Sequence, residues 1–345
     1  MKLTAKEKKD LLGIIATFRR QRIVVWGDMV ADEFVFGEIS RVSREAPVLI
    51  LKHREKVVLP GGGANAVNNL ADLGAQVTPV GVVGRDEAGD ALIRYFSKKK
   101  IPTSSLLRLN RRVTTTKTRI LAGSVHSQRQ QIVRVDREPD PTLPAPIRDR
   151  LRRMAEKHLK SATALLVSDY GYGAVDARAV NDLCKKQRKS SKKGNQKREA
   201  PITLDSRYKL LTYRGITAAT PNEPEIEEAF GVKIGNRPRR LRSLGEKLLE
   251  QLNCRGLLVT RGRDGMVVFE SGKPPHTLSI FGSDEVADVT GAGDTVIAAF
   301  TLALAAGAEF LDAARIANCA AGLVVMKRGT ATVRRKELEE AIRQA

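Results

Sequence analysis

The amino-acid sequence predicts an α/β fold, a three-layer α/β/α domain with a mainly parallel central sheet and a small antiparallel β lid. Short runs rich in Val, Ile and Leu alternate with helical patterns through most of the chain, which is typical of a parallel sheet covered by helices. Two further stretches look extended without an intervening helix, which predicts a separate antiparallel sheet. With 345 residues, 42% of them hydrophobic, the chain can bury a large core.

The elements of the main sheet are expected in a regular order along the chain. Residues 1–20 predict a surface helix, and residues 65–73 and 87–100 predict two more, the first ending at Gly74. Strands are expected at residues 23–26, 77–83, 164–167, 202–204, 217–219 and 257–259. Most of them end in polar residues or glycine, namely Asp28, Ser168, Asp169, Asp205, Asn222 and Thr260. Because ligands bind beyond the carboxyl ends of the strands in open α/β sheets, we expect these residues to share one cleft.

The small sheet is expected from residues 48–58, 114–121 and 130–136. It is either a lid over the cleft or an edge without a function of its own. The longest apolar stretch, residues 296–306, is far shorter than the roughly 20 residues of a spanning helix, and the N-terminus lacks the pattern of a signal peptide. The three cysteines, Cys184, Cys254 and Cys319, have no metal-binding spacing. We therefore expect a cytoplasmic protein without a membrane segment or structural zinc.

The formal net charge of +21 raises the question of nucleic-acid binding. Residues 185–198 alone contain eight Lys and Arg and no acid, so we expect a basic loop over residues 185–199. It has no aromatic residue on which a base could stack. The loop is either a solvated segment or a polyanion-binding tract, and non-specific contact with nucleic acid is compatible with both.

The strongest chemical signal is the segment DVTGAGDT, residues 288–295, which is followed at once by an apolar helix. Gly291 and Gly293 allow a tight turn and a close backbone approach to a ligand, and the first helical amides point unpaired N–H groups at that ligand. Together with Ala292 they predict an anion hole. Asp294 is either a helix cap or, if the anion is a nucleotide phosphate, the base that accepts a proton from an attacking hydroxyl.

These motifs resemble the ribokinase-like (PfkB) family of carbohydrate kinases over residues 23–333. The resemblance implies ATP and Mg²⁺ as cofactors, and leaves a K⁺ site near Asp288 open. It implies sugar binding by Asp28, Asp32, Gly61, Gly62 and Asn65. It implies nucleotide, phosphate and Mg²⁺ binding by Asn222, Glu225, Thr260, Gly262, Gly265 and Asn318, with Glu225 contacting Mg²⁺ through water. Since the sugar motifs are near one end of the chain and the base near the other, residues 21–345 are expected to form a single kinase domain, with lid strands within 34–59 and 112–138.

Residues 37–48 and 129–138 are similar to the heptose-phosphate kinases of bacterial lipopolysaccharide-precursor synthesis. That resemblance implies transfer of the ATP γ-phosphoryl to the anomeric hydroxyl of D-glycero-D-manno-heptose 7-phosphate, giving the 1,7-bisphosphate. A phosphorylated sugar needs cations, and the lid segments contain Arg41, Arg44, Lys117, Arg119, Arg129 and Arg134. Lys117, Arg119 and Arg129 are the expected substrate ligands, although such residues also simply keep strands soluble. Related kinases often dimerise through these strands, so a homodimer is expected.

Several departures from the pattern leave alternatives open. The chain has no HxGH-type nucleotidyltransferase motif, so only the kinase step is expected, and DSR at residues 205–207 replaces DPK. One alternative is a ribokinase-like kinase for another sugar or sugar phosphate, and a second is a nucleic-acid-binding protein on a kinase-like fold. The four histidines, His53, His126, His158 and His276, lack metal or triad spacing and are expected to be structural or on the surface.

Overall fold

The computed structural model describes residues 3–123, 130–192, 199–235, 237–282, 288–327 and 329–345. Its main sheet has nine strands in the order β13-β12-β11-β10-β9-β8-β1-β4-β5, and its strands run parallel except β12, which is antiparallel to both neighbours. The strands are β1 (Arg22–Gly27), β4 (Gln76–Gly84), β5 (Leu106–Leu109), β8 (Ala164–Asp169), β9 (Ile202–Ser206), β10 (Ala218–Ala219), β11 (Gly256–Thr260), β12 (Met266–Glu270) and β13 (His276–Leu278). The expected parallel sheet is confirmed.

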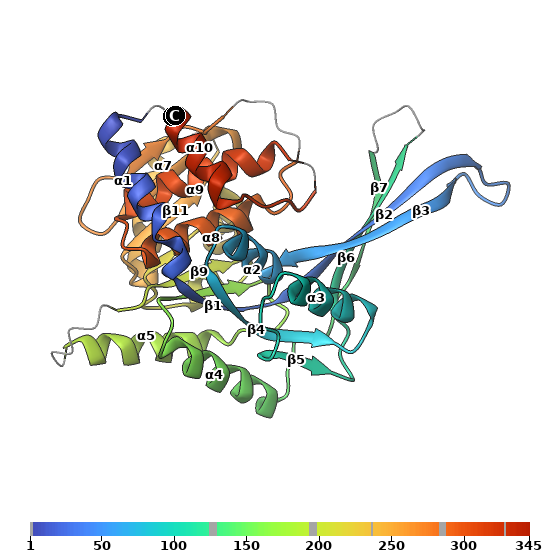
Figure 1. Cartoon of the computed structure of the whole chain (residues 1–345), viewed down its shortest axis with the longest axis horizontal. Helices are drawn as coiled ribbons and strands as arrows, with labels where there is room; N and C mark the ends of the chain where they lie inside the picture. The colour runs from blue at the N-terminus through green and yellow to red at the C-terminus, as the bar shows by residue number, and fades with distance from the viewer. Residues whose placement is uncertain (1–2, 124–129, 193–198, 236, 283–287, 328) are drawn as a thin grey trace.

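Helices cover both faces of this sheet (Figure 1). One face packs against α1 (Ala5–Ala16), α2 (Gly63–Asp72), α3 (Glu87–Lys98), α8 (Ala292–Ala305), α9 (Phe310–Val325) and α10 (Arg335–Gln344). The other packs against α4 (Ala145–Leu159), α5 (Ala177–Lys192), α6 (Glu223–Phe230) and α7 (Pro238–Leu252). Because both faces of the sheet are covered, most residues of β1 and β8 are apolar. These strands therefore show continuous apolar runs instead of an alternation of apolar and polar residues. The result is a three-layer α/β/α domain.

The lid is a four-stranded sheet in the order β3-β2-β6-β7 that extends away from the helices (Figure 1). Its strands are β2 (Met29–Val42), β3 (Leu49–Gly62), β6 (Thr115–Gly123) and β7 (Gln130–Arg137). The outer pairs are antiparallel, as expected, but the central pair β2–β6 is parallel. The reason lies in the chain path, since β2 follows β1, β6 follows β5, and those two strands run in the same direction.

Two local expectations differ from the structure. The basic loop predicted from residue 185 begins as helix, because α5 continues to Lys192, and residues 193–198 lie outside the described part. Lys, Arg and Gln are good helix formers, and no glycine or proline interrupts them before Gly194. The N-terminal helix does more than cover the surface, since Leu11 and Ile15 are fully buried in the same core as α8. Within the described residues, no helix is long and apolar enough to cross a membrane.

Candidate active site

The segment expected to form an anion hole is a glycine turn that leads directly into α8. Gly291 has a φ of 77°, in the left-handed region that glycine tolerates, and a Cβ at this position would lie 2.5 Å from the Nδ2 atom of Asn65. At Gly293 a Cβ would meet nothing within 4 Å, so the backbone there is open to a ligand. Ala292 is the first residue of α8, whose leading N–H groups and dipole favour an anion.

Asp294 lies in the first turn of α8 and is only 4% exposed. One carboxylate oxygen, Oδ2, accepts a hydrogen bond from Asn65 Nδ2 at 2.9 Å, and the other, Oδ1, accepts one from the Tyr170 hydroxyl at 2.8 Å. Asp294 does not cap the helix, because the residue at the cap position is Gly291. Burial, with repulsion from Asp205, raises the pKa of Asp294 to about 8. A carboxylate with a pKa near neutrality is suited to accepting a proton from a hydroxyl.

Two cavities meet at the start of α8. The first, of about 220 Å³, has a mainly apolar wall that includes Met266, Phe281 and Val296, and it contains Gly262, Gly265 and Asn318. The Asn318 amide donates to the carbonyl of Ser279 at 2.7 Å. The second cavity, of about 320 Å³, is lined mostly by polar side chains, and both cavities share Thr260 and Gly293. An apolar pocket beside a polar one fits the base and the phosphates of a nucleotide.

The polar cavity contains a pair of carboxylates. Asn222 and Glu225 form a capping box at the start of α6, in which Asn222 Oδ1 accepts from Glu225 N at 2.8 Å and Glu225 Oε2 accepts from Asn222 N at 3.0 Å. Asp205, at the end of β9, lines the same cavity with Arg207. Burial raises the pKa of Asp205, to which repulsion from Glu225 adds, and burial also raises the pKa of Glu225. Two neighbouring carboxyl groups that do not readily ionise at the same time are suited to binding a divalent cation, which would also contact phosphate oxygens.

Protein side chains alone do not form a complete metal cage here. Among the described residues there is no group of three or more His, Cys, Asp and Glu side chains that could hold a metal ion. Mg²⁺ is commonly held by one or two carboxylates together with substrate phosphates and water, and Asp205 with Glu225 provides that number. Asp288, the residue near the expected K⁺ site, accepts hydrogen bonds from the backbone N–H groups of Thr290 at 2.8 Å and Gly329 at 3.0 Å.

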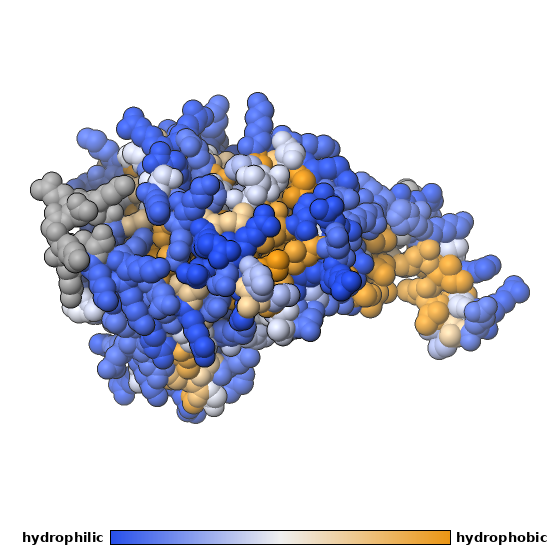
Figure 2. Space-filling view, turned by 90° about the horizontal axis from the view of Figure 1, so that it is seen from below, coloured by the Kyte–Doolittle hydropathy of each residue, from blue (hydrophilic) through white to orange (hydrophobic). Residues whose placement is uncertain are grey.

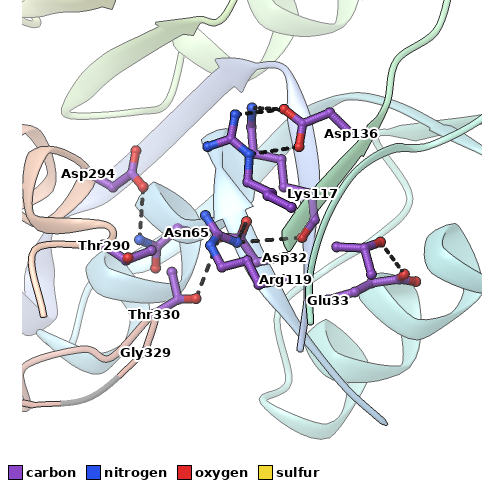
Figure 3. A network of polar contacts seen from close by, with 12 residues as sticks. Asp32, Glu33, Asn65, Lys117, Arg119, Asp136, Thr290, Asp294, Gly329 and Thr330 are labelled. Atoms are coloured by element: carbon purple, nitrogen blue, oxygen red, sulfur yellow. Dashed lines mark hydrogen bonds and ion pairs between the residues drawn. The ribbon is translucent and has the colours of Figure 1, made fainter. Parts of the chain in front are cut away.

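The residues of the expected sugar site meet at the junction of the lid and the main domain (Figure 3). Asp32, on β2, is 4% exposed, and its Oδ1 atom accepts from Arg119 Nη1 at 2.7 Å. A Cβ at Gly61 would lie 2.5 Å from Asp32 Oδ2, so glycine is required for the carboxylate to sit there. Asn65 and Asp294 lie on one side of Asp32, and Lys117 lies on the other. The structure thus brings together residues from both ends of the sequence.

Asp28 has a different environment from Asp32. Its carboxylate accepts three backbone hydrogen bonds, from Tyr170 N at 2.9 Å, Tyr172 N at 3.0 Å and Ala174 N at 2.9 Å. Burial, with repulsion from Asp169, raises the pKa of Asp28 to about 6 in spite of these bonds. Both oxygens of Asp28 thus already accept hydrogen bonds from backbone N–H groups after β8. A structural role in holding this segment is therefore an alternative to the expected contact with sugar hydroxyls.

The lid cations differ in how they are held. Lys117 lies 3.5 Å from Asp136 and 3.4 Å from the Tyr172 hydroxyl, while Arg134 binds Asp136 through two nitrogens. Arg119 is paired with Asp32 and lies over the Phe34 ring. Arg41 and Arg44 are exposed near the far end of β2. Arg129 lies outside the described residues, as does His126.

Two residues near the site, Tyr170 and Tyr172, were not among those expected there from the sequence, whereas Asp205 was expected in the cleft. The Tyr170 hydroxyl contacts Asp294, and the Tyr172 hydroxyl contacts Lys117. The signal for Tyr170 and Tyr172 was their place directly after a strand that ends at the cleft, in the segment SDYGYG. Among the histidines, His158 bonds to the Ser105 hydroxyl, and His53 and His276 are exposed, in agreement with structural or surface roles.

Comparison with known proteins gives three kinds of match. A family model described as pfkB family carbohydrate kinase matches residues 20–337. The bifunctional protein HldE of Desulfatibacillum aliphaticivorans is 37% identical over 325 residues, which is 94% of this chain and 64% of that protein. The bifunctional protein HldE of Geobacter sulfurreducens is 36% identical over 333 residues, which is 96% of this chain and 65% of that protein. The chain therefore spans less than two thirds of the length of these relatives.

Solved structures agree on the fold. A ribokinase from Arabidopsis thaliana, solved with ribose and ATP, has a TM-score of 0.69 at 20% identity, covering 93% of this chain and 98% of that one. Phosphofructokinase-2 from Escherichia coli, solved with potassium, has a TM-score of 0.72 at 16% identity, covering 94% of this chain and 99% of that one. At these identities the likeness shows a ribokinase-like fold and no more.

Proposed function

Because the chain belongs to the pfkB family of carbohydrate kinases, it is an ATP-dependent sugar kinase, and we propose that it phosphorylates the anomeric hydroxyl of D-glycero-D-manno-heptose 7-phosphate. The observation that carries the proposal is the position of Asp294. This buried carboxylate directly follows Gly293, which lines both cavities, and it bonds to Asn65 of the expected sugar motif. No other carboxylate that bonds to Asn65 is found among the described residues.

In the proposed mechanism, Asp294 accepts the proton of the acceptor hydroxyl. The N–H groups at the start of α8 stabilise the negative charge that develops on the phosphoryl oxygens. The apolar cavity at Asn318 is proposed to bind the adenine, and Thr260, Gly262 and Gly265 line it. Asn222, Asp205 and Glu225 would hold Mg²⁺ and the phosphates, where the metal supplies charge neutralisation. K⁺ binding near Asp288 is proposed from the family resemblance.

The phosphate of the sugar is proposed to bind lid cations. Lys117 is the best placed, since its side chain is 13% exposed and its contacts with Asp136 and the Tyr172 hydroxyl are 3.5 and 3.4 Å long, longer than strong charge-assisted bonds. Arg119 is instead engaged with Asp32 at 2.7 Å, so we propose that it orients Asp32 toward the sugar hydroxyls. The relatives named bifunctional protein HldE support a heptose substrate, and the proposal concerns the kinase step alone.

The test compares heptose 7-phosphate with the unphosphorylated heptose at saturating Mg-ATP. Each charge-assisted contact to the phosphate contributes about 1.5 to 3 kcal/mol, so two contacts correspond to a kcat/KM ratio of hundreds or more. Lys117→Ala should reduce that preference, and Lys52→Ala, which changes an exposed lysine of the same sheet, should not. Equal use of both sugars would move the choice to a kinase for a neutral sugar. Preference for a hexose phosphate in the same assay would support a different sugar phosphate.

We also propose a homodimer through the lid. Apolar side chains gather on the lid, at the right of Figure 2. The exposed ones on or beside its strands are Ile39, Val42, Val48, Leu49, Ile132, Val133 and Val135. Burial of such a set against a second copy would remove apolar surface from water and cover exposed strand edges. A further solved structure of phosphofructokinase-2 from Escherichia coli, which has the same fold, is of a tetrameric inhibited form.

Non-specific contact with nucleic acid through residues 185–199 remains a separate proposal. Part of the charge of this segment is engaged within the protein, since Lys186 pairs with Glu156 and Arg188 donates to the Asn253 carbonyl. Deletion of residues 193–198 should lower retention on RNA without changing ATP turnover. A loss of turnover would instead connect the segment to catalysis.

A further inference from the structure

The segment after β8, residues 170–174, connects three parts of the site. Its sequence is YGYGA, and Gly171 and Gly173 have φ values of 82° and 90°. At Gly173 a Cβ would lie 1.9 Å from the Pro141 carbonyl oxygen, so the segment can make this turn only with glycine. The turn sends the two tyrosines to different partners. The Tyr170 hydroxyl donates to Asp294 Oδ1 at 2.8 Å, and the Tyr172 hydroxyl donates to Glu138, just beyond β7, at 2.8 Å.

The backbone of this segment is held by Asp28. Its two oxygens accept the N–H groups of residues 170, 172 and 174, every second residue of the turn. Asp28 itself is 3% exposed and directly follows β1, an interior strand of the main sheet flanked by β8 and β4. A Cβ at Gly62 would lie 2.9 Å from Val30 Cγ2 and 3.3 Å from the Tyr170 ring, so glycine lets both side chains pack closely there.

We propose that Tyr170 is a positioning residue for the base Asp294, and that Asp28 acts through Tyr170 by fixing residues 170–174 instead of binding the sugar. The inference rests on the proposed function, in which Asp294 is the base. It also assigns a second role to Gly62, which leaves space for the Tyr170 ring.

Two donors from separate elements hold the Asp294 carboxylate, Asn65 from α2 and Tyr170 from the 170–174 segment. Each binds a different oxygen, so together they restrict rotation of the group. Both donors stabilise the ionised form, whereas burial and the negative charges of Asp205 and Asp32, which face Asp294, favour the protonated form. Burial also raises the pKa of Tyr170 well above its usual value, so its hydroxyl remains protonated and able to donate. Removing Tyr170 should therefore make Asp294 bind its proton more tightly.

The experiment measures kcat/KM against pH for the whole protein with Mg-ATP and heptose 7-phosphate. Tyr170→Phe should move the acidic limb of this pH profile upward by about one pH unit, which is the scale of one lost hydrogen bond to a charged group. At pH values below the limb, kcat/KM should therefore fall about tenfold, and it should recover as the pH rises. Tyr95→Phe is the matched control. The hydroxyl of Tyr95, on α3, lies 3.4 Å from Asn68, on α2, and does not contact Asp294. Its limb should stay in place.

Asp28→Asn separates the two roles considered for Asp28. If Asp28 acts through Tyr170, the acidic limb of the Asp28→Asn variant should move in the same direction as that of Tyr170→Phe. The kcat/KM of the double variant should then be little lower than that of the more affected single variant. If Asp28 binds sugar, KM should rise by the same factor at every pH, without a shift, and that part of the inference is overturned. Should Asp28→Asn fail to fold, Tyr170→Phe still tests the contact to the base.

Failure of the inference and failure of the proposed function give different results. An unmoved limb in Tyr170→Phe, together with a large loss of turnover in Asp294→Asn, refutes the positioning role and keeps the base. Normal turnover in Asp294→Asn refutes the proposed base itself, whatever Tyr170→Phe does.

Discussion

Replacement of Arg119 by alanine should destabilise the protein far more than replacement of a neighbouring arginine on the same lid. The Arg119–Asp32 pair has an N–O distance of 2.7 Å, and the two side chains are 13% and 6% exposed. Removing one partner of a buried pair costs about 3 to 5 kcal/mol, because the remaining charge is left buried without compensation. Among the described residues, Asp32 would keep a 3.5 Å contact with the Thr330 hydroxyl, and the contact of Arg119 with the Phe34 ring would also be lost.

Arg134→Ala provides the matched control. Arg134 also binds an aspartate, Asp136, but its side chain is 46% exposed, and pairs of this kind contribute about 0 to 1 kcal/mol. Equilibrium urea unfolding should therefore give a free energy of unfolding at least about 2 kcal/mol lower for Arg119→Ala than for Arg134→Ala, with similar m values. Asp32→Asn in the Arg119→Ala background should restore part of the loss. Equal midpoints for the two alanine variants would refute the claim that Arg119 and Asp32 form a buried pair.

Three other outcomes are expected. Asp294→Asn should keep ATP binding, measured by calorimetry, but lower turnover by roughly 10²-fold, the scale of a lost general base; near-normal turnover would contradict that role. In the folded state the pKa values of Asp28 and Asp294 are raised to about 6 and about 8, so the native state binds more protons than the unfolded chain. The free energy of unfolding without ligands should therefore fall as the pH rises from about 5 to about 9. A free energy that rises over this range would show that these carboxyls are ionised in the fold. Light scattering should show a dimer. Val135→Lys, at an exposed lid position, should shift the protein toward monomer, whereas Lys52→Ala should not. An unmodified protein that is monomeric at working concentration would count against the lid interface.

Much of the fold followed from local patterns. The strands around β1 and β8 were predictable because a sheet covered on both faces selects continuous apolar runs, and the residues just beyond these strands marked the cleft. The lid was predicted less completely. β2 was not assigned as a separate strand, and the parallel pairing of β2 with β6 had no signal in the sequence, because pairing partners far apart in the chain are chosen by the path of the main sheet.

The turn that contains the proposed base was also predictable, since Gly291, Gly293 and Asp294 are close together in the sequence, and a glycine turn at a helix start has local chemistry of its own. The amino-acid sequence by itself thus determined the family, the layered fold and the glycine turn at the start of α8. Only the tertiary structure decided which carboxylates remain open to a ligand. Asp28 and Asp32 are equivalent by motif, yet one binds the backbone of residues 170–174 and the other pairs with Arg119. The contact between Tyr170 and Asp294 joins residues 124 positions apart, and such contacts depend on how β8 and α8 pack together rather than on the pattern of either segment.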